Sequence, residues 1–178
     1  MHEDLERVLF TEEEIRAAIQ RVAGEIAADY QEKEITLVTV LRGAVFFAAD
    51  LARALPLPVR MDFLAVSPFP LAPGSGMVRI AKDLDESIAG QHVLLVEDIV
   101  DTGLTLRYLM KTLTLRQPAS LAACAFLDKK PRRLADVPLR YRCFEIPDRF
   151  VVGYGLDYQQ HYRNLPYVAV LKPEVFRG

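Results

Sequence analysis

The stretch that most constrains the fold is VLLVEDIVDTGLT, at residues 93–105. Its four leading aliphatic residues are typical of a strand that is buried on both faces of a parallel sheet. Leu106, Leu109 and Leu113 then recur at helical spacing, so the pattern predicts a strand, a short turn and a helix. Ligands of parallel sheets bind outside the carboxyl ends of the strands. Glu97 and Asp98, at the end of the predicted strand, therefore stand where a ligand would lie.

The turn into the helix has the composition of a phosphate site. It offers a third acid, two hydroxyls, a glycine and the unpaired N–H groups of a helix N-terminus, contributed by Asp101, Thr102, Gly103, Leu104 and Thr105. The upstream carboxylates can accept hydrogen bonds from vicinal hydroxyls, so a ribose 5-phosphate fits the whole stretch. Such a turn can also be a simple helix cap. The adjacent acids favour a site, because their burial and mutual repulsion would be costly without a ligand or a cation.

The composition is that of a soluble globular protein with a single domain over residues 1–178. No apolar run approaches the ~18 residues that a membrane span requires. The net charge of -2 gives no overall attraction to nucleic acid or to an anionic membrane. Cys124 and Cys143 lie in strand-like segments without a CxxC motif, so we expect buried free thiols. We therefore expect a cytoplasmic enzyme with neither nucleic acid nor membrane as a partner.

Strands and helices alternate along the chain, which predicts an α/β fold with a mostly parallel, twisted sheet flanked by helices. A capping box at Thr11 and Glu14 opens the first expected element, a helix that runs to about residue 30. Proline and glycine predict an exposed loop over residues 67–76. The other expected elements are strands over residues 35–41, 59–66, 77–80 and 119–127 and a helix over residues 44–55.

The stretch at residues 93–105 resembles the phosphoribosyl-diphosphate signature of type I phosphoribosyltransferases, a hydrophobic quartet followed by Glu/Asp-Asp, two aliphatic residues and a Thr-Gly loop. Four further segments resemble the hypoxanthine-guanine branch of that family, in its short bacterial form: LRG at 41–43, LDKK at 127–130, FEIPDRFVVGYGLDY at 144–158 and the region of Arg163. The likeness covers about residues 37–171. It implies the type I phosphoribosyltransferase fold, with a core over about residues 35–130. A small hood lobe would be formed by the N-terminal segment and about residues 140–178.

The resemblance also implies roles for the signature residues. Glu97 and Asp98 would bind the ribose hydroxyls, and the turn from Asp101 through Thr102, Gly103 and Leu104 to Thr105 would surround the 5-phosphate. Asp101 would also be the catalytic acid/base group at purine N7.

A second set of residues is implied for the base. Lys129 would meet the purine 6-oxo group, Phe150 would stack on the ring, and Val151 and Asp157 would lie at its edge. An ammonium group only donates hydrogen bonds, so a lysine there favours a 6-oxo over a 6-amino group. On residue type alone, Lys129 could equally be a surface lysine, and Phe150 would more often be a core residue.

Arg42, Gly43 and Arg163 are implied as the pyrophosphate site, with a cis peptide between Leu41 and Arg42. Mg²⁺ is implied as the cofactor, near the carboxylates of Glu97, Asp98 and Asp157. The sequence departs from the family at the mobile lid, where Pro68 and Phe69 replace a Ser-Tyr pair. Lid closure would then use other contacts, such as Ser67.

The implied reaction transfers a phosphoribosyl group from phosphoribosyl diphosphate to N9 of a 6-oxopurine, hypoxanthine or guanine, in a homodimer or homotetramer. Three alternatives remain. A regulatory relative of the same fold would bind RNA and show a basic face. An enzyme of the same family could act on xanthine, adenine or uracil. A response-regulator receiver would instead carry its acidic pair near the first strand.

Overall fold

The computed structural model of the chain describes residues 3–68 and 78–176. In chain order the elements are β1 (Leu5–Phe10), α1 (Glu12–Asp29), β2 (Ile35–Leu41), α2 (Ala44–Ala54), β3 (Val59–Pro68), β4 (Val78–Lys82), β5 (His92–Val100), α3 (Leu104–Thr114), β6 (Ser120–Asp128), the 3-10 turn η1 (Lys130–Arg132), β7 (Tyr141–Glu145), β8 (Val151–Val152), β9 (Val168–Leu171) and α4 (Pro173–Phe176). None of the helices in these residues is long and apolar enough to cross a bilayer.

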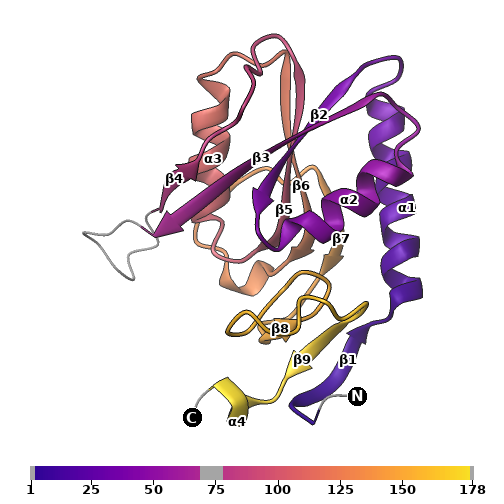
Figure 1. Cartoon of the computed structure of the whole chain (residues 1–178), viewed down its shortest axis with the longest axis vertical. Helices are drawn as coiled ribbons and strands as arrows, with labels where there is room; N and C mark the ends of the chain where they lie inside the picture. The colour runs from indigo at the N-terminus through magenta and orange to yellow at the C-terminus, as the bar shows by residue number, and fades with distance from the viewer. Residues whose placement is uncertain (1–2, 69–77, 177–178) are drawn as a thin grey trace.

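A six-stranded sheet in the order β4-β3-β2-β5-β6-β7 forms the centre of the molecule (Figure 1). Every neighbouring pair is parallel except β3 and β4. The predicted α/β class with a mostly parallel sheet is confirmed. Its central strands follow the sequence pattern closely, since β2 is buried at all but its last residue.

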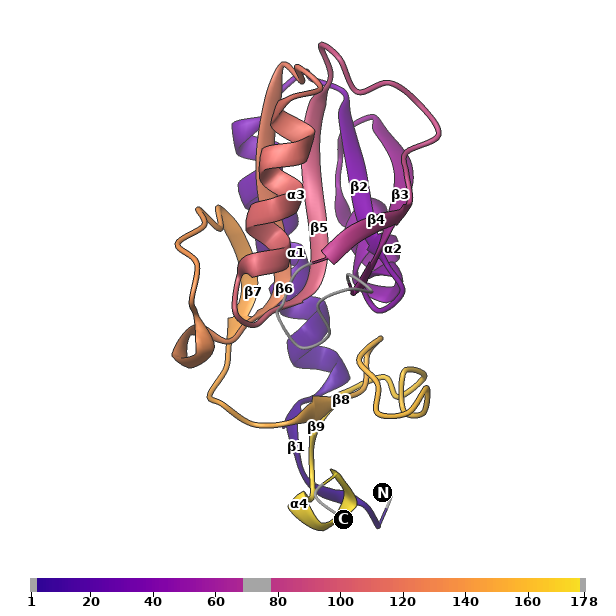
Figure 2. The same cartoon turned by 90° about the vertical axis from the view of Figure 1, so that its left-hand side faces the viewer.

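Helices cover both faces of this sheet. α1 and α2 lie on one face and α3 on the other (Figure 2). The side chains of β5 alternate between the two layers, because consecutive strand residues point to opposite faces. Leu94 and Val96 join the core under α1 and α2, whereas Val93 and Leu95 join the core under α3.

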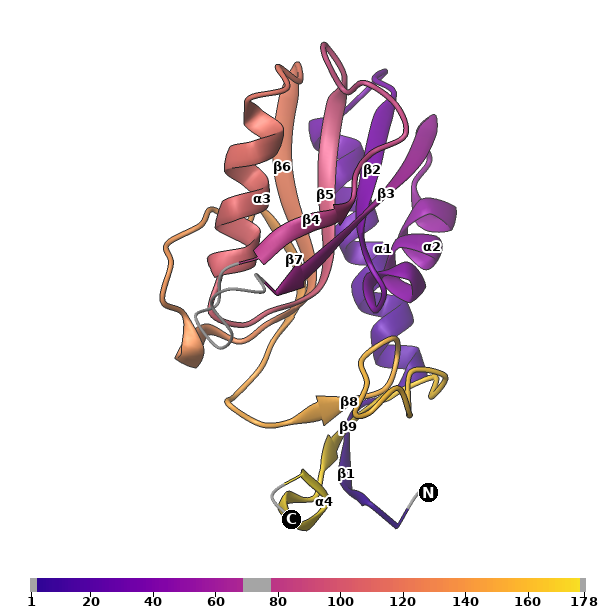
Figure 3. The same ribbon diagram turned by 60° about the vertical axis from the view of Figure 1, so that its left-hand side comes forward.

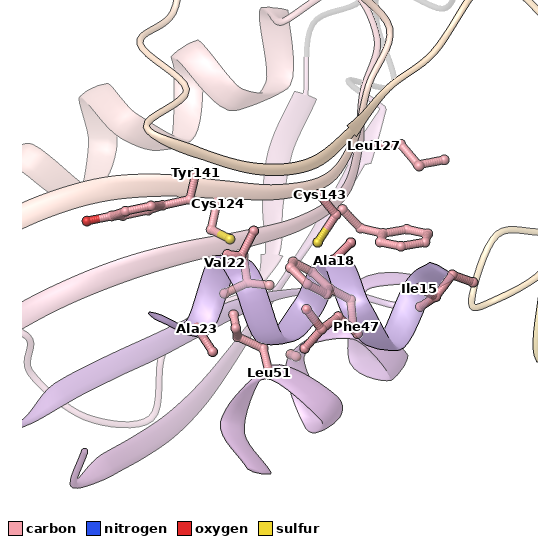
Figure 4. Packing of buried hydrophobic residues seen from close by; sticks show 14 of the residues in the cluster. Ile15, Ala18, Val22, Ala23, Phe47, Leu51, Cys124, Leu127, Tyr141 and Cys143 are labelled. Atoms are coloured by element: carbon pink, nitrogen blue, oxygen red, sulfur yellow. The ribbon is translucent and has the colours of Figure 1, made fainter. Parts of the chain in front are cut away.

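The core under α1 and α2 contains both cysteines. Cys124 of β6 lies beside Val22 of α1, and Cys143 of β7 lies beside Ala18 of the same helix (Figure 4). Both thiols are free and buried, as the sequence analysis predicted. Burial raises the pKa of the Cys143 thiol to about 12, so the group stays protonated and packs as a small apolar side chain.

A small antiparallel sheet, β1-β9-β8, lies beyond one end of the large sheet, next to both chain ends (Figure 1). Leu5, Val152 and Ala169 belong to its own hydrophobic cluster. We call this sheet, together with the loops of residues 153–167, the hood.

Two expectations need correction. The chain begins with strand β1, not with the first predicted helix; only Leu5 of this edge strand is buried, so it carries no clear alternation. The segment YRCFEI was assigned to the hood, but β7 pairs in parallel with β6 in the large sheet, so the hood begins after Glu145. A short edge strand does not reveal its partner in its sequence. Of the expected loop over residues 67–76, Ser67 and Pro68 are instead the last residues of β3, opposite Arg79 and Val78 of β4. The rest of that loop, with the lid position Phe69, lies outside the described residues.

Candidate active site

The order of the strands reverses between β2 and β5. From β2 the chain moves to β3 and β4 on one side, whereas from β5 it moves to β6 and β7 on the other. Ligands of open α/β sheets bind where the order reverses, outside the carboxyl ends of the strands. The loop after β2 and the last residues of β5 occupy that position, and the hood loops lie next to them (Figure 3).

The acidic pair lies within β5, which continues to Val100. Glu97 borders a pocket of about 90 Å³ at the start of α3, while Asp98 borders a second pocket of about 250 Å³ against the hood. Ile99 borders both pockets. The two acids were expected to bind the ribose hydroxyls together, whereas the alternation of strand side chains divides them between two neighbouring pockets.

Burial shifts the titration of both acids. Loss of water raises the pKa of Glu97 well above its ordinary value, and the charge of Asp98 adds to this. Burial also raises the pKa of Asp98 to about 6, although its Oδ1 accepts a 2.7 Å hydrogen bond from the N–H of Ile99. The cation of Arg163 favours the ionised form of Asp98, and the charge of Asp157 opposes it. Buried acids of this kind gather at functional sites.

The 90 Å³ pocket lies at the N-terminus of α3. Gly103 has a φ of +80°, which glycine adopts without steric cost, and it directs the chain from the strand into the helix. The N–H of Leu104 lies 3.4 Å from the hydroxyl oxygen of Thr102. The predicted turn residues that line the pocket, together with Glu97, are Asp101, Thr102, Gly103 and Thr105; Leu104 opens the helix without lining it. The amides and helix dipole there suit an anion.

Asp101 lacks a hydrogen-bonded partner for one carboxylate oxygen. Its Oδ1 is buried and lies 3.3 Å from Nε of Arg132, without the alignment of a hydrogen bond. A buried acceptor without a partner is costly. This oxygen is therefore available to accept a proton or a hydrogen bond from a ligand.

The 250 Å³ pocket brings together all the residues predicted for the base. It is lined by Asp98, Ile99, Lys129, Phe150, Val151, Leu156 and Asp157. Lys129 is only 7% exposed, so its interpretation as a surface lysine is wrong. Its Nζ lies 3.8 Å from Oδ1 of Asp148, an ion pair too long for a hydrogen bond.

Phe150 is not a core residue. Its side chain is 37% exposed, and its ring stacks on Phe176 with the centroids 4.8 Å apart. Tyr158 contacts the same ring edge-on at 5.7 Å. These contacts hold an aromatic ring at the border of the pocket, where a planar ligand can stack on it.

The loop after β2 touches both Asp98 and the hood. The predicted cis peptide between Leu41 and Arg42 is confirmed. A Cβ on residue 43 would overlap Oδ2 of Asp98 and would lie 3.1 Å from the carbonyl oxygen of Gly155. Only glycine therefore lets this loop approach the acid so closely.

Arg163 is anchored in the hood. Its Nη1 donates to the carbonyl oxygen of Gly155 at 2.7 Å, and its Nη2 pairs with Oδ1 of Asp157 at 2.7 Å. Arg42 reaches the same region, because its Nη1 donates to Oε1 of Gln160 at 3.3 Å. The two predicted pyrophosphate-binding arginines thus lie together, next to Asp157.

A larger cavity, of about 470 Å³, lies between α1, α2 and the hood. Its arginines already have acidic partners, since Arg16 pairs with Glu12 and Arg53 with Asp50. The buried acidic pair and the unpartnered Oδ1 of Asp101 lie at the carboxyl end of β5, and we place the candidate site there.

Comparison with known proteins identifies the family. The family model described as the phosphoribosyl transferase domain matches residues 9–159, which is most of the chain. The chain belongs to the phosphoribosyltransferase family.

Relatives of this phosphoribosyltransferase match it over nearly their whole length. The hypoxanthine-guanine phosphoribosyltransferase of Mycobacterium avium is 47% identical, with 98% of this chain and 89% of the relative covered. The hypoxanthine-guanine phosphoribosyltransferase of Bacillus subtilis is 44% identical, with 100% of this chain and 99% of the relative covered. A solved structure of the hypoxanthine phosphoribosyltransferase of Trypanosoma cruzi, in complex with the product IMP, superposes with a TM-score of 0.93 at 47% identity, covering 99% of both chains.

The phosphoribosyltransferase site also contains residues that the sequence analysis did not single out. Arg132 lies beside Asp101, Asp148 beside Lys129, and Gln160 between the two arginines. Each is a polar residue in a turn or a loop, Arg132 in η1 and the other two outside the helices and strands. Nothing in its local sequence separates it from other surface residues, and only the folded chain shows what it contacts.

Proposed function

We propose that this phosphoribosyltransferase transfers the 5-phosphoribosyl group of phosphoribosyl diphosphate to N9 of hypoxanthine or guanine, giving IMP or GMP and pyrophosphate. The observation that carries the choice of base is the burial of Lys129 in the pocket that Phe150 borders. Nζ of Lys129 is paired with Asp148 at 3.8 Å, which is too far for a hydrogen bond. A buried ammonium group needs hydrogen-bond acceptors, because a buried charge without hydrogen bonds is costly. A 6-oxo group supplies one, whereas a 6-amino group presents a second donor.

The nucleotide would lie across both pockets. Its 5-phosphate occupies the pocket at the start of α3, which Thr102, Gly103 and Thr105 line. Its base occupies the pocket of Lys129, which Phe150 and Val151 also line. The ribose spans Ile99, which borders both pockets, and its hydroxyls donate to the carboxylates of Glu97 and Asp98. Binding relieves the unfavourable burial of these acids.

Asp101 is proposed as the group that handles the proton of the base. Attack by N9 places positive charge on the purine, and a base at N7 removes it by taking the proton. The buried Oδ1 of Asp101 suits this role because no protein donor is hydrogen-bonded to it. The leaving diphosphate is proposed to bind Arg42, Arg163 and the loop at Gly43, where guanidinium groups stabilise its negative charge.

Mg²⁺ fits this set of residues by its chemistry. Asp98 and Asp157 repel each other electrostatically, and carboxylate oxygens are the ligands that Mg²⁺ prefers. In residues 3–68 and 78–176, no three acidic, histidine or cysteine side chains come close enough to hold a metal alone. Asp157 and the acidic pair would therefore bind a cation through water and together with the diphosphate substrate. When bound, Mg²⁺ neutralises charge on the leaving group.

The proposal extends to setting and assembly. The net charge of -2 gives the chain no overall attraction for polyanions. This supports a cytoplasmic enzyme that acts on small molecules, with neither nucleic acid nor a membrane as its partner. We propose a homodimer or homotetramer. The RNA-binding alternative has no support, since the polar groups at the site line two neighbouring pockets that suit the phosphate and the base of a nucleotide.

The test is the release of pyrophosphate from phosphoribosyl diphosphate and Mg²⁺ with each of five bases: hypoxanthine, guanine, xanthine, adenine and uracil. Turnover with hypoxanthine and guanine, and little with adenine or uracil, supports the proposal. Turnover with adenine or uracil alone contradicts the role of Lys129. Xanthine is the second candidate among 6-oxopurines, because it offers the same acceptor to that lysine.

A further inference from the structure

Gln160 contacts both arginines of the proposed pyrophosphate site. Its Oε1 accepts from Nη1 of Arg42 at 3.3 Å and from Nη2 of Arg163 at 3.4 Å. The two arginines come from distant parts of the chain: Arg42 follows β2 in the large sheet, and Arg163 belongs to the hood. In the described residues, this amide oxygen is where the two guanidinium groups meet.

The backbone of Gln160 is held by Asp157, the partner of Arg163. Its N–H donates to Oδ2 of Asp157 at 2.9 Å, and Oδ1 of that carboxylate pairs with Arg163 at 2.7 Å. The residue has a φ of +66°, an uncommon conformation for a residue other than glycine. The backbone of Gln160 is thus held in place although its side chain is exposed.

An uncharged acceptor is well suited to this position. Two guanidinium groups repel each other, and a shared hydrogen-bond acceptor offsets part of that repulsion. A carboxylate would do so more strongly, but it would also cancel the positive charge that attracts a diphosphate. The amide oxygen brings the two cations together and leaves both charges available to an anion.

We propose that Gln160 is a positioning residue for pyrophosphate binding: it joins Arg42 of the sheet to Arg163 of the hood, so that both guanidinium groups bind one diphosphate. This inference rests on the proposed function. Gln160 need not touch the base, the ribose or the reacting atoms, so its effect is confined to the diphosphate.

The test compares three variants in the reverse reaction, with GMP and inorganic pyrophosphate as substrates and Mg²⁺ present. Gln160→Glu keeps the shape of the side chain and adds a negative charge between the arginines. Gln160→Ala removes the acceptor. Gln159→Glu is the matched control, since Gln159 is also exposed and has a φ of +51°, but its Nε2 donates to the hydroxyl of Tyr158 at 3.1 Å.

Gln160→Glu is expected to raise the KM for pyrophosphate about tenfold, which corresponds to about 1.4 kcal/mol, with kcat changed less than about twofold. Gln160→Ala should raise the same KM by a smaller factor, and Gln159→Glu should leave it within about twofold of the wild type. The melting temperature of Gln160→Glu should be equal to or above that of the wild type, because a carboxylate accepts more strongly from both arginines.

Equal KM values for Gln160→Glu and Gln159→Glu would overturn the inference, since a general effect of added charge would then explain both. So would a Gln160→Glu variant that loses thermal stability and all kinetic parameters together, which indicates a merely structural role. In both cases an active wild type leaves the proposed function standing. A wild type without pyrophosphate-dependent turnover of GMP contradicts the proposed function, and this inference with it.

Discussion

The backbone of Gly43 lies directly against the carboxylate of Asp98, where a Cβ would overlap Oδ2. This contact joins the loop after β2 to the end of β5. It places the proposed pyrophosphate loop beside the proposed ribose site, and the carbonyl oxygen of Gly155 in the hood lies 3.1 Å from the same Cβ position.

Gly43→Ala should displace either the loop or the acid. Because Ile99 holds Oδ1 of Asp98 by a hydrogen bond, we expect the loop to move. A shift of about 1 Å at a reacting centre can cost about 100-fold, so kcat/KM for phosphoribosyl diphosphate should fall by about that factor. The control is Gly24→Ala on the exposed side of α1, where nothing lies within 4 Å of the new Cβ. That variant should keep full activity and gain up to about 1 kcal/mol of stability. Full activity of Gly43→Ala would show that the close approach is not needed.

Asp98→Asn should change how stability depends on pH. Burial raises the folded-state pKa of Asp98 from 3.8 to about 6, so the folded chain binds this proton more tightly than the unfolded chain. The stability that this tighter proton binding contributes is therefore complete below about pH 4, and it is lost as the pH rises through about 6. Thermal unfolding should find the Asn variant more stable than the wild type at pH 7.5, with the difference vanishing near pH 4. A difference that does not change with pH would contradict the buried, unfavourable charge.

Asp101→Asn should remove the proposed proton transfer while keeping the shape of the side chain. General acid–base groups contribute about 10²–10⁴-fold, so kcat should fall by a factor in that range. The KM for phosphoribosyl diphosphate should change much less, because the phosphate pocket keeps its backbone groups. Steady-state kinetics measure both parameters, and Asp136→Asn, at an exposed position, is the control. An unchanged kcat would exclude Asp101 from the chemistry.

Lys129→Ala should reduce the use of 6-oxopurines. Hydrogen bonds to charged groups contribute about 1.5–3 kcal/mol, so kcat/KM for guanine should fall by roughly tenfold to a hundredfold. Lys130→Ala is the matched control, since the adjacent lysine is half exposed and pairs with Glu145 at 2.7 Å outside the pocket. Discrimination between guanine and adenine should narrow in the first variant alone. Equal guanine kinetics in both variants would contradict the contact with the 6-oxo group.

The sequence predicts the buried elements well, because an apolar run or a capping box is each typical of one kind of element. The apolar run from Ile35 to Leu41 is a strand with those bounds, and the capping box at Thr11 sets the start of α1. The prediction fails at edge strands. β1 buries only Leu5, and β7 is short although it buries Tyr141 and Cys143. Their partners, β9 and β6 respectively, are set by the pairing in the fold and not by the local sequence.

The site follows a similar rule. Residues attached to strong patterns, such as Glu97 and Gly103, could be located from sequence spacing alone, and resemblance added Lys129 and Phe150. The alternation that sends Glu97 and Asp98 into different pockets was implicit in the strand but became clear only once β5 was seen to continue past both. Gln160 could not be predicted, because its importance depends on two arginines that the fold brings to it.

The most direct test of the account is a crystal structure of the chain with bound GMP. In that structure we expect the 5-phosphate at the N-terminus of α3, the ribose hydroxyls at Glu97 and Asp98, and the guanine 6-oxo group within hydrogen-bond distance of Nζ of Lys129. A nucleotide bound elsewhere, or one whose ribose leaves both acids without a contact, would contradict it.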